Sequence, residues 1–265
     1  MTKIPYRIDL AGGWLDQPEV SEAYPGPVVV VGVEATRDYG NRCGMATSSR
    51  AAANRLWGDR LPNNRIVNIK KERRSEIRSG HGWKTNPEEL AKLVFAVENP
   101  PGGKFISGSQ DAIGITHPGI HALHYCNDYW PKWIQQIGDN KTVEWLEQYI
   151  WLRQLEARPP RFDVLQDKLV SPANAKKLAE AGHNCIRAIQ CQSVKALGLS
   201  VSDSFEAQVA MYPNMVTPEI MHLVRNIKQH VYGVKISGAG GGGYLVLITD
   251  NPNIDCAIPV KLRRL

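Results

Sequence analysis

Residues 235–244 read Lys-Ile-Ser-Gly-Ala-Gly-Gly-Gly-Gly-Tyr, a glycine-rich turn between two apolar segments. Five of the six residues from Gly238 to Gly243 are glycine. A hairpin needs only about two central residues, so a plain turn does not require this many glycines. Because glycine has no Cβ, its backbone N–H groups can surround an anion closely. We interpret the segment as an anion-binding turn, with a flexible hairpin as the alternative.

Two further segments place carboxylates beside small residues. Residues 7–16 read Arg-Ile-Asp-Leu-Ala-Gly-Gly-Trp-Leu-Asp, in which an apolar strand runs into a Gly-Gly turn between Arg7 and Asp16. Residues 107–111 read Ser-Gly-Ser-Gln-Asp and end on Asp111. Such a carboxylate can serve as a general base or a metal ligand. Taken alone, however, Asp16 could simply cap its turn and Asp111 could form an Asx turn.

The hydrophobic pattern predicts a mixture of strands and helices. The β-branched run from Pro27 to Val33 is typical of a buried strand, and further strands are expected over 234–237 and 244–249. The elements do not alternate regularly as strand, helix, strand. The sequence therefore predicts an α+β fold and not a doubly wound parallel sheet.

Capping residues predict where the helices begin. Asn86, Ser171 and Thr217 each precede a proline, which favours the first helical position. The helix after Asn86 is expected to end before Pro100, and the helix after Ser171 is expected to continue to Gly198. Another helix is expected to begin at Ser48 or Ser49.

In this order and combination, the three segments resemble the GHMP kinases, the family of galactokinase, homoserine kinase and mevalonate kinase. The first segment looks most like that of L-fucose kinases and heptose-phosphate kinases. Residues 207–218, with Gln208, Tyr212 and Pro213, are similar to the helix and turn that precede the glycine-rich motif in this subgroup. The resemblance extends over residues 5–249, with a poorly matched stretch at 56–104. It implies a two-domain fold, with a ribosomal-protein-S5-like domain over 1–158 and a ferredoxin-like domain over 159–265.

The resemblance also implies roles for individual residues. Asp111 matches the catalytic aspartate of the family, and Arg7 matches the basic residue that approaches the reacting centre. Asp16 matches the acidic residue that holds sugar hydroxyls, with Gly13 and Trp14 beside it at the substrate. The glycine-rich turn is expected to lie beside the phosphates through Gly238 and beside the substrate through Gly240 and Gly241.

The ATP-phosphate loop of the family is the motif that this sequence matches least well. Its counterpart is the segment 44–53, which begins about thirty residues after Gly13. The expected nucleotide-binding residues are Gly44, Ala46, Thr47, Ser48 and Ser49, and Ser48 is also expected near the metal. Ala46 replaces the second glycine of the family pattern, and no proline precedes the loop. If that position needs a positive φ, alanine costs about 1 kcal/mol there.

Composition limits the other classes of function. The chain has 265 residues, a formal net charge of +6 and five cysteines, without zinc-ribbon spacing. Its longest apolar run is far shorter than the roughly 20 residues that span a bilayer, so we expect a cytoplasmic protein without a membrane partner. Basic residues are dispersed, so nucleic acid is not an expected partner. The sequence does not indicate the oligomeric state.

His117, His121 and His124 would share a face only on a helix, and Pro118 and Gly119 argue against one. The family resemblance instead implies a strand over 120–126, which sends His121 and His124 to opposite faces, so we predict no metal site there. The leading hypothesis is an ATP- and Mg²⁺-dependent sugar or sugar-phosphate kinase. The alternative is a GHMP-fold sensor that binds a sugar or nucleotide without turnover, which the degenerate loop favours.

Overall fold

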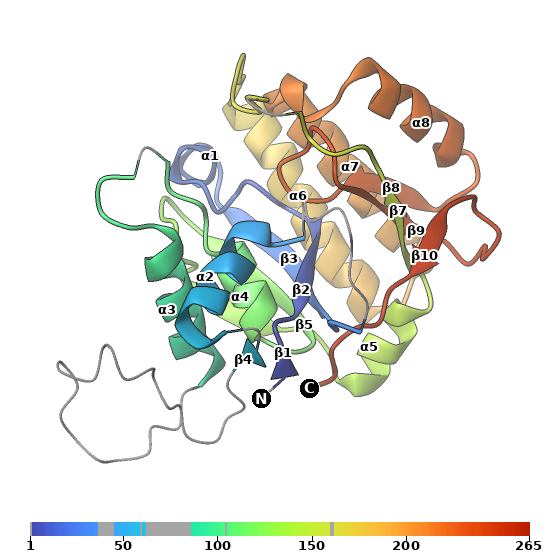
Figure 1. The fold of residues 1–265 in the computed structure, drawn as a ribbon. Coiled ribbons are helices and arrows are strands. Elements are labelled where there is room, and N and C mark those ends of the chain that lie inside the picture. The colour runs from blue at the N-terminus through green and yellow to red at the C-terminus, as the bar shows by residue number, and fades with distance from the viewer. Residues whose placement is uncertain (1, 37–44, 59, 62–85, 104, 160–161) are drawn as a thin grey trace, which may run out of the picture.

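The computed structural model describes residues 2–36, 45–58, 60–61, 86–103, 105–159 and 162–265 (Figure 1). In chain order the elements are β1 (Thr2–Lys3), β2 (Tyr6–Ala11), α1 (Pro18–Ala23), β3 (Gly26–Val33), α2 (Thr47–Trp57), β4 (Arg60–Leu61), α3 (Pro87–Glu98), α4 (Gln110–Thr116), β5 (Ile120–Tyr125), β6 (Trp133–Gln136), α5 (Asn140–Glu147), β7 (Ile150–Gln154), α6 (Pro172–Gln190), α7 (Val194–Met211), the 3₁₀ helix η2 (Pro213–Met215), α8 (Pro218–Lys228), β8 (Gly233–Ile236), β9 (Tyr244–Ile248) and β10 (Ala257–Pro259).

The first sheet is antiparallel and has the strand order β2-β3-β5-β6. Every residue of β3 is buried, as the β-branched run predicts. Val29 and Val31 belong to the same core cluster as Ile189 of α6. Val28 belongs to a second cluster with Ile113 of α4. Because successive strand residues point to opposite faces, helices cover β3 on both sides.

The second sheet is also antiparallel, in the order β10-β7-β9-β8. Helices α6 and α7 lie between the two sheets, since α6 packs on β3 and α7 packs on β8 (Figure 1). Two glycines make the second contact close: a Cβ on Gly198 of α7 would come within 2.3 Å of the Tyr232 backbone, and a Cβ on Gly233 of β8 would lie 2.0 Å from the Gly198 carbonyl oxygen. Helices α6 and α7 thus connect β2, which carries Arg7, to β8, which carries Lys235.

The helix starts predicted at Asn86, Ser171 and Thr217 are confirmed, whereas the helix expected from Ser48 or Ser49 begins at Thr47 with Ala46 as its N-cap. Asn86 forms a full capping box with Glu89, and α3 ends before Pro100. The Ser171 side chain accepts from the Asn174 N–H, and the Thr217 side chain accepts from the Ile220 N–H. Each of these three helices has proline in its first turn, as expected.

The prediction of one continuous helix from Ser171 to Gly198 is wrong. Helix α6 ends at Gln190, and α7 begins at Val194. Gln192 has φ 50°, a left-handed conformation that no helix continues through. Ser193 then caps α7 by accepting from the Ala196 N–H at 3.4 Å. The sequence does not reveal this break, because residues 190–193 contain neither the glycine nor the proline that commonly marks a helix end.

The α+β fold class is confirmed, since both four-stranded sheets are entirely antiparallel. The domain boundary near 159 stays a prediction. β7, which precedes it, pairs with β9 and β10, which follow it. Among the described helices, none combines the length and the apolar character needed to cross a membrane.

We expect Gly182→Ala to destabilise the fold. A Cβ at this α6 position would lie 2.3 Å from the Pro27 carbonyl oxygen of β3, so helix and sheet would have to separate. Overpacking of this kind costs about 1–3 kcal/mol, which exceeds the roughly 1 kcal/mol that alanine gains over glycine in a helix. Urea denaturation should show a lower midpoint for this variant but not for the exposed Glu180→Ala on the same helix. Equal midpoints for the two variants would contradict the close packing.

Candidate active site

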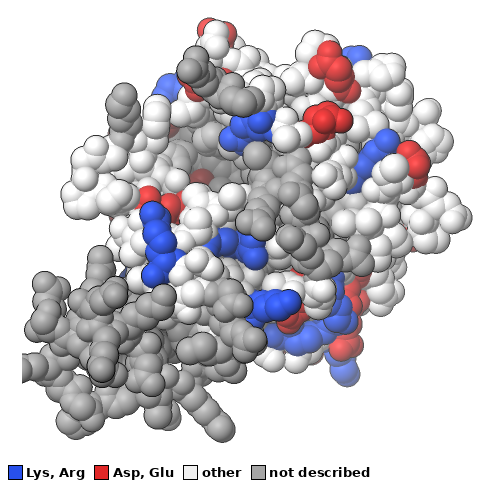
Figure 2. All heavy atoms as spheres, viewed as in Figure 1, with Lys and Arg blue, Asp and Glu red and all other residues white. Residues whose placement is uncertain are grey.

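A cavity of about 930 Å³ brings together residues from β2, from the turn that follows β8, from the start of α2 and from the loop before α4. The face in Figure 2 shows basic and acidic side chains interspersed among its described residues. Most of the predicted site residues line the cavity: Arg7, Gly13, Trp14, Asp16, Ala46, Thr47, Ser48, Asp111 and Gly238. Ser49, Gly240 and Gly241 lie behind this lining, and Gly44 lies outside the described residues.

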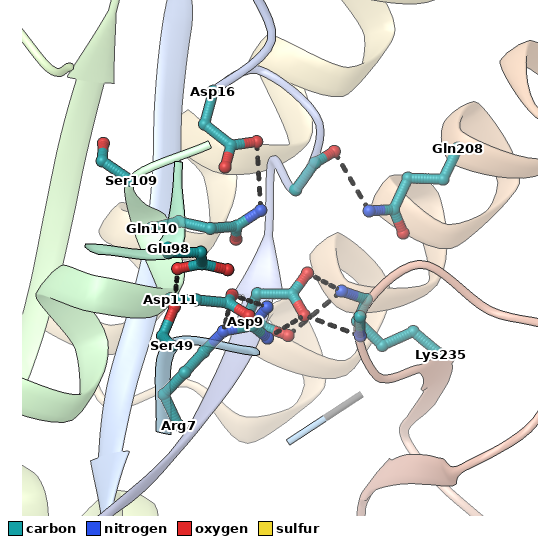
Figure 3. A network of polar contacts seen from close by, with 12 residues as sticks. Arg7, Asp9, Asp16, Ser49, Glu98, Ser109, Gln110, Asp111, Gln208 and Lys235 are labelled. Atoms are coloured by element: carbon teal, nitrogen blue, oxygen red, sulfur yellow. Dashed lines mark hydrogen bonds and ion pairs between the residues drawn. The ribbon is translucent and has the colours of Figure 1, made fainter. Parts of the chain in front are cut away.

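Four charged side chains form the centre of the site (Figure 3). Arg7 of β2 donates Nε and Nη2 to Asp111 Oδ1, and it donates Nη1 to Asp9 Oδ1 at 3.0 Å. Lys235 of β8 donates to the second carboxylate oxygen of Asp9 and, at 3.1 Å, to the Asp9 carbonyl. Asp9 therefore binds two cations at once and joins the two sheets.

Burial and charge pairing oppose each other in this cluster. Burial alone would raise the pKa of Asp9, but Lys235 and Arg7 hold it below its ordinary value. Burial lowers the pKa of Lys235, which Asp9 opposes. Burial also disfavours the charged Arg7, but Asp111 and Asp9 outweigh it and the pKa of Arg7 is raised. The guanidinium is therefore a fixed positive charge next to Asp111.

Asp111 lies in the first turn of α4 and not in the small-residue turn that the sequence predicts. The helix begins directly after Ser109, whose hydroxyl donates to the Tyr129 carbonyl at 2.6 Å. A negative charge in a first helical turn interacts favourably with the helix dipole. Asp111 is thus held by the helix start and by Arg7 while its side chain still lines the cavity.

Asp16 is buried at the other side of the cavity and differs from Asp111 in its environment. Gln110 Nε2 donates to Asp16 Oδ1 at 3.1 Å. Burial, and then the negative charge of Asp111, raise the pKa of Asp16 to about 7. At neutral pH this carboxyl is therefore close to half protonated.

Two amides near Asp16 have spare hydrogen-bonding capacity. Gln208 of α7 donates Nε2 to the Gly13 carbonyl at 3.1 Å. The side-chain oxygens of Gln110 and Gln208 have no hydrogen-bond partner among the described residues, and both residues line the cavity. Unpartnered amide oxygens beside a carboxyl are acceptors for hydroxyl groups.

The beginning of α2 lines the cavity opposite the glycine-rich turn. Ala46 is the N-cap of α2, and no side chain caps this helix. Its φ is 58°, in the left-handed region that favours glycine. A helix N-terminus without a side-chain cap can bind an anion through its N–H groups and its dipole. The structure thus gives this segment a conformation suited to phosphate, with a strained alanine at its entrance.

A carboxylate that the sequence did not single out lies beside α2. The Ser49 hydroxyl donates to Glu98 Oε2 at the end of α3, and Glu98 Oε1 has no partner among the described residues. Burial, and then Asp111, raise the pKa of Glu98. The described residues contain no group of three or more metal-binding His, Cys, Asp or Glu side chains. Mg²⁺, however, commonly takes only one or two carboxylates plus substrate phosphates, and Glu98 and Ser48 supply oxygens suited to it.

The glycine-rich turn is held against η2 and the segment after β7. Gly241 N donates to the Met215 carbonyl at 2.7 Å, and a Cβ on Gly240 would lie 2.4 Å from the same oxygen. Both glycines have positive φ. Met215 Sδ in turn accepts from Trp14 Nε1 at 3.3 Å. The expected substrate residues Gly240 and Gly241 therefore act here through backbone packing and not at the cavity surface.

The histidines separate as expected from a strand. The His121 ring lies 5.2 Å from the His117 ring, whereas the His124 ring stacks on Trp133 at 4.3 Å. His121 and His124 therefore lie on opposite faces of β5. Burial lowers the pKa of His121 to about 3, so this ring is neutral at physiological pH.

Sequence reasoning assigned no role to Asp9, Lys235, Gln208 or Glu98. One signal was available: Asp9 follows Arg7 by two positions on a strand, so both side chains point to the same face. A second signal was Lys235, because a lysine within an otherwise apolar strand needs a buried partner for its charge. The contact between Ser49 and Glu98 had no such signal, because the two residues are far apart in the sequence.

No protein-family model matches this sequence, and no curated protein matches it significantly. Solved structures are similar in fold. A D-glycero-D-manno-heptose 1-phosphate kinase from Bacteriodes thetaiotaomicron has a TM-score of 0.60 at 14% identity, covering 99% of this chain and 96% of that chain. Lactococcus lactis galactokinase complexed with galactose has a TM-score of 0.61 at 10% identity, covering 99% and 93%. Methanococcus jannaschii mevalonate kinase has a TM-score of 0.57 at 15% identity, covering 94% of this chain and 90% of that chain. The chain therefore has the GHMP kinase fold, as predicted.

We expect Asp16→Asn to stabilise the protein at alkaline pH. The pKa of Asp16 is raised from 3.8 to about 7 in the folded state, so the folded protein holds the Asp16 proton more tightly than the unfolded chain does. This difference contributes fully to the stability of the fold below about pH 4. That contribution is lost as the pH rises from about 4 to 7, at about 1.4 kcal/mol per pKa unit. Asparagine resembles the protonated form and does not titrate. Thermal unfolding should therefore show similar stability at pH 4 and a more stable variant at pH 8.

The exposed Glu180→Gln serves as the control for this pH series, because its side chain is 56% exposed. Its difference from wild type should stay small at both pH values. If Asp16→Asn gained nothing between pH 4 and pH 8, Asp16 would not be the buried acid described above.

Proposed function

We propose that this chain transfers the γ-phosphoryl group of ATP to a hydroxyl of a sugar or sugar phosphate, of the L-fucose or heptose type. The single observation that carries this proposal is the placement of Asp111. This carboxylate is fixed by Arg7 in a cavity that the N-terminus of α2 also lines. A hydroxyl nucleophile needs a base or an orienting carboxylate, and a transferred phosphoryl group needs positive charge and N–H donors.

The residues divide the work as follows. Asp111 accepts the proton of the acceptor hydroxyl as its oxygen bonds to the γ-phosphorus, while the bond to the bridging oxygen breaks and ADP leaves. Arg7 holds Asp111 in place and supplies a positive charge beside the reacting phosphoryl group. Asp16, Gln110 and Gln208 orient the remaining hydroxyls. The first turn of α2 and Gly238 bind the phosphates, and Ser48 and Glu98 would hold Mg²⁺, which supplies charge neutralisation when bound.

The expected partners are ATP, Mg²⁺ and one small acceptor. A cytoplasmic location stays a prediction, as does membership of the sugar-kinase subgroup. The GHMP-fold neighbours include kinases for sugars and for mevalonate, so the acceptor is the least constrained part of the proposal.

Asp111→Asn should reduce turnover by about 10²–10⁴-fold with little change in the KM for ATP. The change removes a proton acceptor and not a phosphate contact. A coupled ADP-release assay on L-fucose, galactose, mannose and heptose phosphates first identifies the acceptor. Asp128→Asn, at a half-exposed carboxylate outside the cavity, is the matched control and should keep wild-type turnover. Full activity in Asp111→Asn would reduce Asp111 to a structural helix-start residue.

A specific observation favours a second candidate function, a non-catalytic sugar or nucleotide sensor. Ala46 occupies a left-handed conformation at the helix start that faces the proposed phosphates. The strain of about 1 kcal/mol weakens any site that must approach phosphate closely. A sensor would bind Mg-ATP or a sugar yet release no ADP with any acceptor of the panel.

Substitution at Ala46 tests the phosphate loop itself. Ala46→Gly should tighten Mg-ATP binding a few-fold because it relieves strain of about 1 kcal/mol, although glycine also loosens the free loop. Ala46→Val should weaken binding at least 10-fold, because a β-branched residue is an outlier at positive φ. Calorimetric titration measures both affinities, and circular dichroism checks that the variants remain folded. A folded valine variant with wild-type affinity would show that 44–49 is not the phosphate loop.

A further inference from the structure

The cations that line the cavity differ in whether a carboxylate already neutralises them. Arg7 pairs with Asp9 and Asp111, and Lys168 donates to Glu19 at 2.6 Å. Arg158 also lines the cavity, but among the described residues it pairs with no carboxylate. Among the described residues, its guanidinium makes one hydrogen bond, from Nε to the Gly240 carbonyl at 2.8 Å. This bond leaves both terminal nitrogens of the guanidinium available.

The backbone that carries Arg158 is fixed to the glycine-rich turn. Leu155 N donates to the Gly243 carbonyl at 2.9 Å, and Gly243 N donates to the Glu156 carbonyl at 3.2 Å. A Cβ on Gly242 would come within 2.7 Å of the Arg158 N atom, so the two segments pack backbone to backbone. The Arg158 side chain is therefore held at both ends, at its backbone and at the Nε hydrogen bond of its guanidinium. Such preorganisation lowers the entropy lost when a ligand binds.

The surroundings place Arg158 on the acceptor side of the cavity. Its partner Gly240 packs on Met215, and Met215 contacts the Trp14 indole. Trp14 belongs to the same turn as Asp16, whose carboxyl we assign to acceptor hydroxyls. Of the proposed phosphate-binding residues, those at the start of α2 belong to a different segment, whereas Gly238 lies two positions before Gly240 in the same turn.

Among the described residues of the cavity, no carboxylate neutralises the charge of Arg158. Asp9 and Asp111 are neutralised by Lys235 and Arg7, and Glu19 pairs with Lys168. Asp16 remains, and burial raises its pKa to about 7, so it carries only part of a negative charge at neutral pH. A preorganised guanidinium with two available nitrogens binds phosphate and carboxylate oxygens in pairs.

We propose that Arg158 binds an anionic group that the acceptor carries in addition to its reacting hydroxyl. The acceptor is then a sugar that already bears a phosphate or a carboxylate, and not a neutral sugar. This inference rests on the proposed function, which defines the acceptor and its reacting hydroxyl. Binding of the anionic sugar, however, does not require turnover.

The first experiment measures binding without ATP. Melting temperatures of the whole chain are compared for matched sets: galactose, galactose 1-phosphate and galacturonate; mannose and mannose 1-phosphate; and D-glycero-D-manno-heptose with its 1-phosphate. We expect at least one anionic member to stabilise the wild type more than its neutral parent does. The phosphate and the uronate arms distinguish the two kinds of anion. If no anionic member exceeds its parent, the inference is overturned.

The second experiment repeats the comparison with Arg158 variants. Arg158→Met should weaken binding of the anionic sugar by roughly 10-fold to 100-fold, the size expected for a charge-assisted hydrogen-bonded pair. Arg158→Lys keeps the charge but loses the paired geometry, so an intermediate loss is expected. Lys168→Met is the matched control, because it removes a cavity cation that Glu19 already neutralises, and it should change affinity less than about 3-fold. Equal losses at Arg158 and Lys168 would overturn the inference in favour of a general charge effect.

Kinetics then separate this inference from the proposed function. With an active acceptor, Arg158→Met should raise the KM of the anionic sugar while kcat and the KM for ATP stay near wild type. A rise confined to the KM for ATP would place Arg158 on the nucleotide and overturn the inference while the kinase proposal stands. Conversely, Arg158-dependent binding of a sugar phosphate without ADP release from any acceptor would uphold the inference and refute the kinase proposal.

Discussion

The contact between Lys235 and Asp9 is the constraint on which the rest of the site depends. Both side chains are buried, and Lys235 is 0% exposed, so neither charge can be hydrated if its partner is lost. Removing one member of a buried ion pair costs about 3–5 kcal/mol, far more than an exposed pair is worth. Because Lys235 lies on β8 and Asp9 on β2, this penalty acts against any separation of the two sheets. The glycine-rich turn follows directly from β8, and Gly238 N donates to Asp9 Oδ1 at 3.3 Å, so the turn is placed by the same pair.

The same pair also determines how Arg7 is used. With one Asp9 oxygen directed to Lys235 and the other to Arg7 Nη1, the guanidinium is held in one orientation, and its Nε and Nη2 face Asp111. A planar guanidinium can satisfy two carboxylates in this way, whereas a lysine at position 7 could not fix the direction of Asp111. Charges that are already oriented need no rearrangement during a reaction. The energy that stabilises the interface between the sheets therefore also preorganises the candidate base.

The sequence predicts local features of this protein better than contacts between distant segments. Capping at Asn86, Ser171 and Thr217, and the buried strand predicted over 27–33, depend on neighbours within a few residues, and the structure confirms them. The break at Gln192 was missed because no glycine or proline lies between Gln190 and Ser193 to indicate it. Resemblance of short motifs brought Arg7, Asp16 and Asp111 together, and the fold places all three at one cavity. Glu98 was not found, because its contact with Ser49 spans 49 positions and no local pattern reports it.

The two acids of the cavity illustrate why residue type alone does not determine a role. Asp111 is paired with a guanidinium that is itself held by a buried carboxylate, so the Asp111 side chain is fixed in direction within the cavity. Asp16 is buried, lies in the field of Asp111 and accepts a hydrogen bond from the Gln110 amide, and burial and the Asp111 charge raise its pKa to about 7. A carboxyl that is half protonated at neutral pH can donate one hydrogen bond and accept another, which suits a group that holds hydroxyls. Two carboxyls with such different environments can divide the work of orienting the acceptor and removing its proton. The division depends on Arg7 facing Asp111 and not Asp16, and therefore on the buried Asp9 that directs it.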